Sequence, residues 1–136
     1  MNVILLLNFL LAVSGLMADH LVNPIGIDNP LPRFSWHLED DRPGAGQAAY
    51  RLIVSKDPLA FDGNLVWDSG RVASDAVLAA YCGPELKPFT RYWWRVICEN
   101  NDGMEVQSEM AFFETGMMEQ KNWRGCWISD KQGVDF

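Results

Sequence analysis

Three adjacent acidic residues of this 136-residue chain, Glu39, Asp40 and Asp41, are of a type that could support catalysis. Paired carboxylates can act as general acid and as base or nucleophile in hydrolysis when they face each other across a cleft. Here the acids are consecutive, next to Arg42 and within a segment that contains proline and glycine. Such a run is typical of a solvated loop, so we predict no catalytic residue in it.

The other residues that could form a nucleophilic or metal site are scattered along the chain. The histidines, His20 and His37, lie on or near expected strands, and no Gly-x-Ser-x-Gly elbow that would expose a nucleophilic serine occurs. Asp28 and Asp68 are isolated from other metal-ligand types, which favours a turn-capping role for both. We therefore expect no catalytic residue, no metal site and no cofactor.

The three cysteines, Cys82, Cys98 and Cys126, show neither Cys-x-x-Cys nor Cys/His ligand spacing, so the sequence predicts no zinc site. Cys98 falls on the apolar phase of an alternating segment, which favours a buried thiol that behaves as a small hydrophobic side chain. A Cys82–Cys98 disulfide is the alternative if the chain is exported.

The overall charge narrows the classes of partner. Eighteen acidic residues against eleven basic ones give a net charge of −7. A nucleic-acid-binding surface must be basic to meet the phosphates, so this balance argues against a nucleic-acid partner. The length corresponds to one domain.

The tryptophans give the only functional argument with some force in this sequence. Trp36 and Trp94 share the phase of apolar neighbours, so both are predicted to pack in the core. Trp93 points the opposite way and is flanked on its own face by Arg91 and Arg95. It could stack with these arginines, contact a neighbouring domain, or bind a sugar as a weak substrate-binding candidate.

Two further tryptophans, Trp123 and Trp127, follow the last expected strand. They lie in a tail that no longer has a sandwich core to enter, although they could fold back on the sandwich edge. Exposed, they would form an apolar patch that is prone to association.

The residues discussed above must be positioned by secondary-structure elements. The clearest predicted element is a strand over residues 91–100. Tyr92, Trp94, Val96 and Cys98 alternate with the opposite face, which is the pattern of a strand buried on one side. A tyrosine at the start of such a strand is the tyrosine-corner device, in which its hydroxyl bonds to backbone a few residues upstream. Tyr92 is therefore predicted to be structural, together with Trp36 and Trp94.

Seven short strands in all are expected, at roughly ten-residue spacing. No long helical period interrupts them, and Asn100–Gly103 is a strong turn signal. This pattern predicts an all-β fold, an immunoglobulin-like sandwich of about seven antiparallel strands. The expected strands cover residues 16–22, 33–39, 49–55, 65–70, 77–82, 91–100 and 109–115.

The apolar start of the chain suggests a leader. Residues 3–13 are about the length of a signal-peptide core, and small residues near Gly15 and Ala18 offer cleavage sites. We expect a hydrophobic leader over residues 1–15 and an exported protein, periplasmic or extracellular, that would meet a membrane only through an uncleaved leader. A natural hydrophobic strand or a mis-assigned start codon is the alternative, and without a signal peptide the protein would be cytoplasmic. The sandwich is expected over residues 16–116 and a linker into a further domain over 117–136.

An ordered series of segments resembles a known family. The segment 86–100 with Phe113–Gly116 is similar to the end of a fibronectin type III domain. More specifically, the chain resembles the opening of bacterial α-L-rhamnosidases, a resemblance that extends from about Leu16 to Ile128. The segments that carry it are NPIGID at 23–28, PRFSW at 32–36, QAAYRLIV at 47–54, WDSGRV at 67–72 and NWRGCWI at 122–128.

This resemblance implies a non-catalytic, fibronectin type III-like accessory module of a multidomain glycoside hydrolase that removes terminal α-L-rhamnose. The family's catalytic residues lie in a helical barrel that these residues do not include. The resemblance therefore implies that the partners are neighbouring domains, and we expect Trp93, Trp123 and Trp127 to be the contacts to them. Because the family's first strand matches residues 16–21, cleavage near Gly15 is favoured over cleavage after Ala18. The alternative function is a stand-alone carbohydrate-binding or adhesive module, with Trp93 and Trp67 as the sugar contacts.

Overall fold

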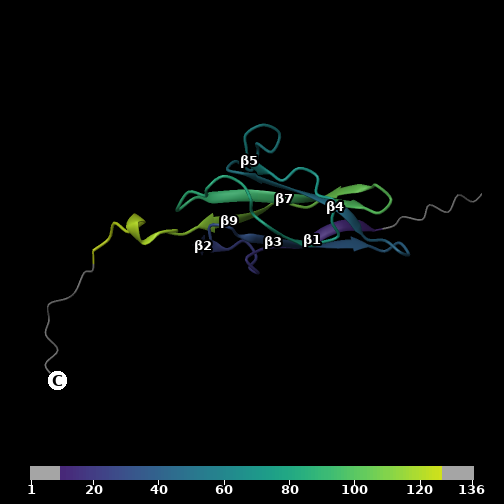
Figure 1. Cartoon of the computed structure of the whole chain (residues 1–136), viewed down its shortest axis with the longest axis horizontal. Coiled ribbons are helices and arrows are strands. Elements are labelled where there is room, and N and C mark those ends of the chain that lie inside the picture. Colours follow the sequence, from purple (N-terminus) through teal and green to yellow (C-terminus); the bar gives the residue numbers. More distant parts are fainter. Residues whose placement is uncertain (1–9, 127–136) are drawn as a thin grey trace, which may run out of the picture.

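The computed structural model describes residues 10–126, and these form two β-sheets that face each other (Figure 1). A single 3₁₀ turn, η1 at Gln120–Asn122, follows the last strand. Within residues 10–126, no helix is long and apolar enough to cross a membrane. The nine strands are β1 (Leu11–Ala18), β2 (Ile25–Ile27), β3 (Arg33–Asp40), β4 (Gln47–Ser55), β5 (Leu65–Asp68), β6 (Leu78–Ala80), β7 (Arg91–Asn100), β8 (Glu105–Gln107) and β9 (Ala111–Thr115).

The small sheet has the order β1-β3-β6, and the large sheet has the order β2-β9-β7-β4-β5. β8 and β9 both pair with β7, β8 beside Ile97–Glu99 and β9 beside Arg91–Trp94. All pairs are antiparallel except β2 with β9, which is parallel. The predicted all-β sandwich of the immunoglobulin type is confirmed. The two strands beyond the expected seven, β2 and β8, have three residues each, too few for alternation to be visible in a sequence.

The core lies between the sheets and is built on the inward face of β7. Tyr92, Trp94, Val96 and Cys98 are all buried, as the period of two requires. The centroid of the Trp94 ring lies 4.5 Å from that of Phe34 on β3, and Trp36 belongs to the same core cluster. The structure thus places Tyr92, Trp36 and Trp94 in the interior that holds the two sheets together.

β4 is buried on both faces over part of its length. Leu52 and Val54 face the core, and Ile53 is buried on the opposite side. The 56–64 loop covers that side, because Phe61 and Leu65 line the same groove as Ile53 and Arg95. A strand with both faces covered shows a continuous apolar run rather than a clean alternation, as residues 52–54 do here.

The expected strand over residues 16–22 is wrong in its bounds, because β1 runs from Leu11 to Ala18. The chain then reverses: Ala18 and Leu21 pair across a turn in which Asp19 and His20 both have positive φ. Two such residues in succession match a tight hairpin turn rather than a strand. A domain boundary at Leu16 would therefore divide β1. Of the expected leader over residues 1–15, residues 1–9 lie outside the described part, and the leader stays a prediction.

Candidate interaction surfaces

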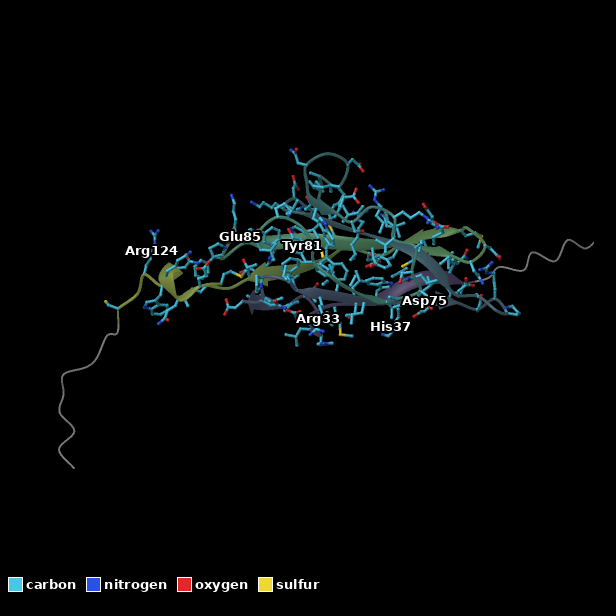
Figure 2. The ribbon with its side chains drawn as sticks, in the orientation of Figure 1. Arg33, His37, Asp75, Tyr81, Glu85 and Arg124 are labelled. Atoms are coloured by element: carbon cyan, nitrogen blue, oxygen red, sulfur yellow. The ribbon has the colours of Figure 1, made fainter. Side chains whose placement is uncertain are left out.

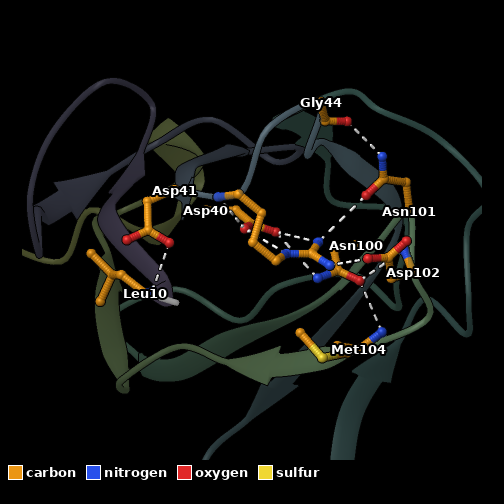
Figure 3. Close-up of polar contacts among 9 residues, drawn as sticks. Leu10, Asp40, Asp41, Gly44, Asn100, Asn101, Asp102 and Met104 are labelled. Carbon is orange, nitrogen blue, oxygen red and sulfur yellow. Dashed lines mark hydrogen bonds and ion pairs between the residues drawn. The ribbon is translucent and has the colours of Figure 1, made fainter. Parts of the chain in front are cut away.

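The acidic run is held in a polar network at one end of the sandwich (Figure 3). The Asp40 carboxylate accepts hydrogen bonds from Arg42 Nε at 2.9 Å and Nη2 at 2.8 Å. Arg42 also pairs with Asp102 on the 100–104 turn. Both Asp40 and Arg42 are largely buried as side chains. The hydrogen bonds from Arg42 hold the pKa of Asp40 at about 2, below its usual value.

The two neighbouring acids also have structural partners. Glu39 Oε1 accepts a hydrogen bond from Ser14 Oγ at 2.8 Å, which ties β3 to β1. Asp41 Oδ1 accepts one from the Leu10 backbone N–H at 2.8 Å. The three carboxylates therefore point to three different partners, and the network joins the 40–46 loop to the 100–104 turn.

The isolated aspartates and histidines each have a separate environment. Asp28 Oδ1 accepts from the Met118 N–H at 2.8 Å, and Asp68 Oδ1 accepts from the Gly70 N–H at 2.9 Å. Asp68 also pairs with Arg51, whose hydrogen bonds lower the pKa of that carboxyl. His37 is exposed on the outer side of the small sheet (Figure 2), and His20 is exposed in its turn. Among residues 10–126, no group of three or more His, Cys, Asp or Glu side chains could hold a metal ion.

The three cysteines differ in how far their side chains are buried. Cys98 is fully buried on β7, and burial raises the pKa of its thiol to about 12. Cys82 and Cys126 are exposed, and all three are free thiols. The alternative of a Cys82–Cys98 disulfide is therefore wrong for this structure. Cys98 belongs to the core, whereas Cys82 follows β6 on the surface.

Trp93 lies on the outer face of the large sheet, and a phenylalanine packs against it. Its cross-strand neighbour on β9 is Phe112, whose ring meets that of Trp93 edge-on at 5.3 Å between centroids. Arg91 covers the ring of Phe112 at 4.3 Å, and Arg95 covers that of Phe61 at 4.2 Å. The expected stacking of both arginines on Trp93 is therefore replaced by stacking on two other rings.

Sequence reasoning missed Phe112 and Phe61. Phe112 lies opposite Trp93 only because of the register between β7 and β9, and Phe61 reaches Arg95 only because the 56–64 loop folds over β4. The alternation of residues 109–115 places Met110 and Phe112 on one face, and the structure buries the other face, with Ala111 and Phe113. Trp67, on the edge strand β5, packs against Tyr81 at 5.0 Å between ring centroids.

A second aromatic surface lies where the chain leaves the sandwich. Phe89, in the corner before β7, is 67% exposed, and Trp123, just after η1, is 59% exposed. Both line one groove together with Pro88, Lys121 and Arg124. We call these five residues the exit surface. Trp127, which was grouped with Trp123 as a domain contact, lies outside the described residues.

Sequence reasoning also missed Phe89. Its backbone has a φ of +50°, a conformation that bulky residues seldom adopt. No alternation or turn motif marks this conformation in advance, because the corner is held by hydrogen bonds that its backbone N–H groups donate to the Tyr92 hydroxyl and to the segment after β9. A phenylalanine directly after Lys-Pro in a corner was the one available signal.

Comparison with known proteins gives a consistent result. A family described as the Rha78A-like, N-terminal immunoglobulin domain matches residues 13–119. An α-L-rhamnosidase of Streptomyces avermitilis is 38% identical over 121 residues, which are 88% of this chain and 12% of that protein. An α-L-rhamnosidase of Formosa agariphila is 36% identical over 112 residues, 79% of this chain and 12% of that protein.

Solved structures agree with these matches. The Streptomyces avermitilis α-L-rhamnosidase complexed with L-rhamnose superposes with a TM-score of 0.83, over 88% of this chain and 12% of that one. An α-L-rhamnosidase from Dictyoglumus thermophilum superposes with a TM-score of 0.81 at 34% identity, over 89% of this chain and 14% of that one. The chain therefore spans only 12–14% of the length of these relatives.

Proposed function

This chain belongs to the family of Rha78A-like, N-terminal immunoglobulin domains, and from that membership we propose that it is a non-catalytic accessory module of an α-L-rhamnosidase. The parent enzyme would hydrolyse terminal α-L-rhamnose from glycosides. The observation that carries the proposal is the match itself: 88% of this chain corresponds to 12% of a relative named as an α-L-rhamnosidase. The chemistry of such an enzyme then lies in residues other than these.

The local environments of the acidic residues support a structural role. Glycoside hydrolysis needs two carboxyl groups that face each other across the scissile bond, roughly 5–10 Å apart. In the described part of the chain, Asp40 is neutralised by Arg42, Asp68 by Arg51 and Glu99 by Arg71. Carboxylates with lowered pKa values in ion pairs are poorly suited to donate a proton near neutral pH.

As a module, the sandwich would contribute a rigid body to the larger enzyme and pack against a neighbouring domain. Its own core is extensive, with aromatic side chains from both sheets, so it needs no partner to bury them. The alternative of a stand-alone sugar-binding module stays a prediction. The ring of its weak candidate, Trp93, packs against Phe112 rather than standing free as a stacking platform.

An activity assay on the purified 136-residue chain tests the proposal. We expect no release of aglycone from an aryl α-L-rhamnoside, while the Streptomyces avermitilis enzyme under the same conditions gives robust release. Cooperative urea unfolding of the chain, followed by core tryptophan fluorescence, would establish that the inactive sample is folded. Turnover by the folded chain that survives repurification would contradict the proposal.

A further inference from the structure

We propose that the exit surface is the docking site for the domain that follows this module in α-L-rhamnosidases, with Phe89 and Trp123 as its two apolar anchors. The inference rests on the proposed function, because it requires a longer parent enzyme. The partner is identified by its chemistry: an apolar patch large enough to cover two aromatic side chains, with carboxylates around it.

Phe89 is held outward by a rigid corner. Three backbone N–H groups of the corner donate hydrogen bonds. That of Lys87 donates to Tyr92 Oη at 2.8 Å and that of Phe89 to the Gly116 carbonyl at 2.9 Å. That of Thr90 donates to Thr115 Oγ1 at 2.9 Å. These bonds keep Phe89 in the left-handed region that glycine occupies at less cost. Fold stability alone would favour a small residue here, so an exposed phenylalanine calls for another reason.

Trp123 is brought to the same place by the segment after β9. The Gly116 N–H donates to the Ile27 carbonyl at 2.8 Å, and the Met118 N–H donates to Asp28 Oδ1 at 2.8 Å. Asn122 Nδ2 then donates to the Met117 carbonyl at 2.7 Å and closes the turn that precedes Trp123. Two aromatic side chains from separate segments thus line one groove of about 510 Å³. Large aromatic residues fixed in position before binding are typical anchors of interfaces.

The location of the exit surface indicates which partner binds there. The segment 116–126 leaves the sandwich at the end where β2 and β9 lie and extends beyond the body of the domain (Figure 1). The family match ends at residue 119, so Trp123 lies past the domain itself. The relatives' matched segments are only 12% of their length. A neighbouring domain of the same polypeptide is therefore the partner that must come close to this end.

The charged residues around the exit surface indicate which charges a partner surface should carry. The chain has a net charge of −7, but two exposed basic residues, Lys121 and Arg124, line the groove together with Phe89 and Trp123. Lys121 pairs with Glu119, while Arg124 takes part in no ion pair among the described residues. A partner surface with carboxylates opposite these cations would be favoured.

A chimera tests the proposal. This chain replaces the matched segment of the Streptomyces avermitilis enzyme, and unfolding is followed by calorimetry. We expect the module to unfold together with the following domain, at a higher Tm than the free 136-residue chain. In the Phe89→Gly/Trp123→Ser chimera, the module should unfold separately at the Tm of the free chain that carries the same substitutions.

Leu59→Ser is the matched control, since Leu59 is also exposed but lies in the 56–64 loop. It should leave the coupled unfolding unchanged, and Phe89→Gly should not lower the Tm of the free chain. Three results would overturn the docking site. The first is that the module unfolds independently in the unsubstituted chimera, and the second is that the two domains still unfold together in the Phe89→Gly/Trp123→Ser chimera. The third is that Leu59→Ser abolishes the joint unfolding as fully as the double substitution does. Rhamnoside hydrolysis by the free chain would instead contradict the proposed function and leave these results intact.

Discussion

The hydroxyl of Tyr92 accepts a hydrogen bond of 2.8 Å from the backbone N–H of Lys87, five residues upstream. Tyr92 itself is buried, stacked on Phe113 at 5.3 Å between ring centroids. One residue thus joins the core to the corner that enters β7. This corner also carries Phe89, so the bond links the stability of the sandwich to the geometry of the exit surface.

Replacing Tyr92 by phenylalanine should destabilise the chain while leaving its core volume nearly unchanged. The Lys87 N–H would lose its partner, and we expect the free energy of unfolding to fall by about 1–2 kcal/mol. Urea unfolding measured by circular dichroism checks this value. Tyr50→Phe is the control, because its hydroxyl makes no hydrogen bond within the described residues, and a similar loss there would contradict the interpretation.

The two adjacent tryptophans should differ strongly in their contribution to stability. Trp94 is fully buried against Phe34, so Trp94→Ala should cost about 3–5 kcal/mol or prevent folding. Trp93 is only partly buried on the outer face, so Trp93→Ala should cost about 1–2 kcal/mol. Urea midpoints of both variants test the difference, and equal losses would show that the inward and outward phases of β7 are wrongly assigned.

The ion pair between Asp40 and Arg42 should make stability depend on pH at acid values. Its hydrogen bonds hold the folded-state pKa of Asp40 at about 2, below the ordinary value of 3.8 that applies when the chain is unfolded. A carboxyl whose pKa is lowered on folding stabilises the folded state above its ordinary pKa, and this contribution is lost as pH falls from about 4 toward 2.

Asp40→Asn should therefore lower the urea midpoint at pH 6 and make its decline between about pH 4 and pH 2 shallower than in the unsubstituted chain. Asp68 and Glu99 also have lowered pKa values, so a residual decline should remain in the variant. Asp62→Asn, at an exposed position that no ion pair of the described residues involves, is the control. Identical pH profiles for Asp40→Asn and the unsubstituted chain would contradict the prediction.

N-terminal truncation tests the position of β1. Residues 11–14 pair with β3 between His37 and Asp40, and Val13 is buried in the core. A chain that starts at Leu16 loses these contacts, and its free energy of unfolding should be about 3 kcal/mol lower than that of a chain that starts at Leu10. Equal urea midpoints for the two chains would show that the expected boundary at Leu16 was adequate.

Much of the fold followed from local patterns. A strand's side chains alternate between faces, so the period of two over Tyr92, Trp94, Val96 and Cys98 was enough to place these residues inward. The turn at Asn100–Gly103 and the spacing of the strands then predicted a sandwich. No such alternation was available at β1: residues 16–22 were expected as one irregular strand, and the positive φ of Asp19 and His20 reverses the chain within it.

The surfaces depend on contacts between residues that are far apart in the chain, which no local pattern encodes. Arg42 reaches Asp102, sixty positions away, and Phe112 meets Trp93 only through the register of β9 on β7. Phe89 and Trp123 share a groove because hydrogen bonds fix two separate segments at one end of the sandwich. By itself, the sequence determined which side chains of β7 face the core, because that choice is set by backbone geometry within a single strand. The tertiary structure alone decided which outward side chains meet, because that choice depends on the register and packing of the sheets and their loops.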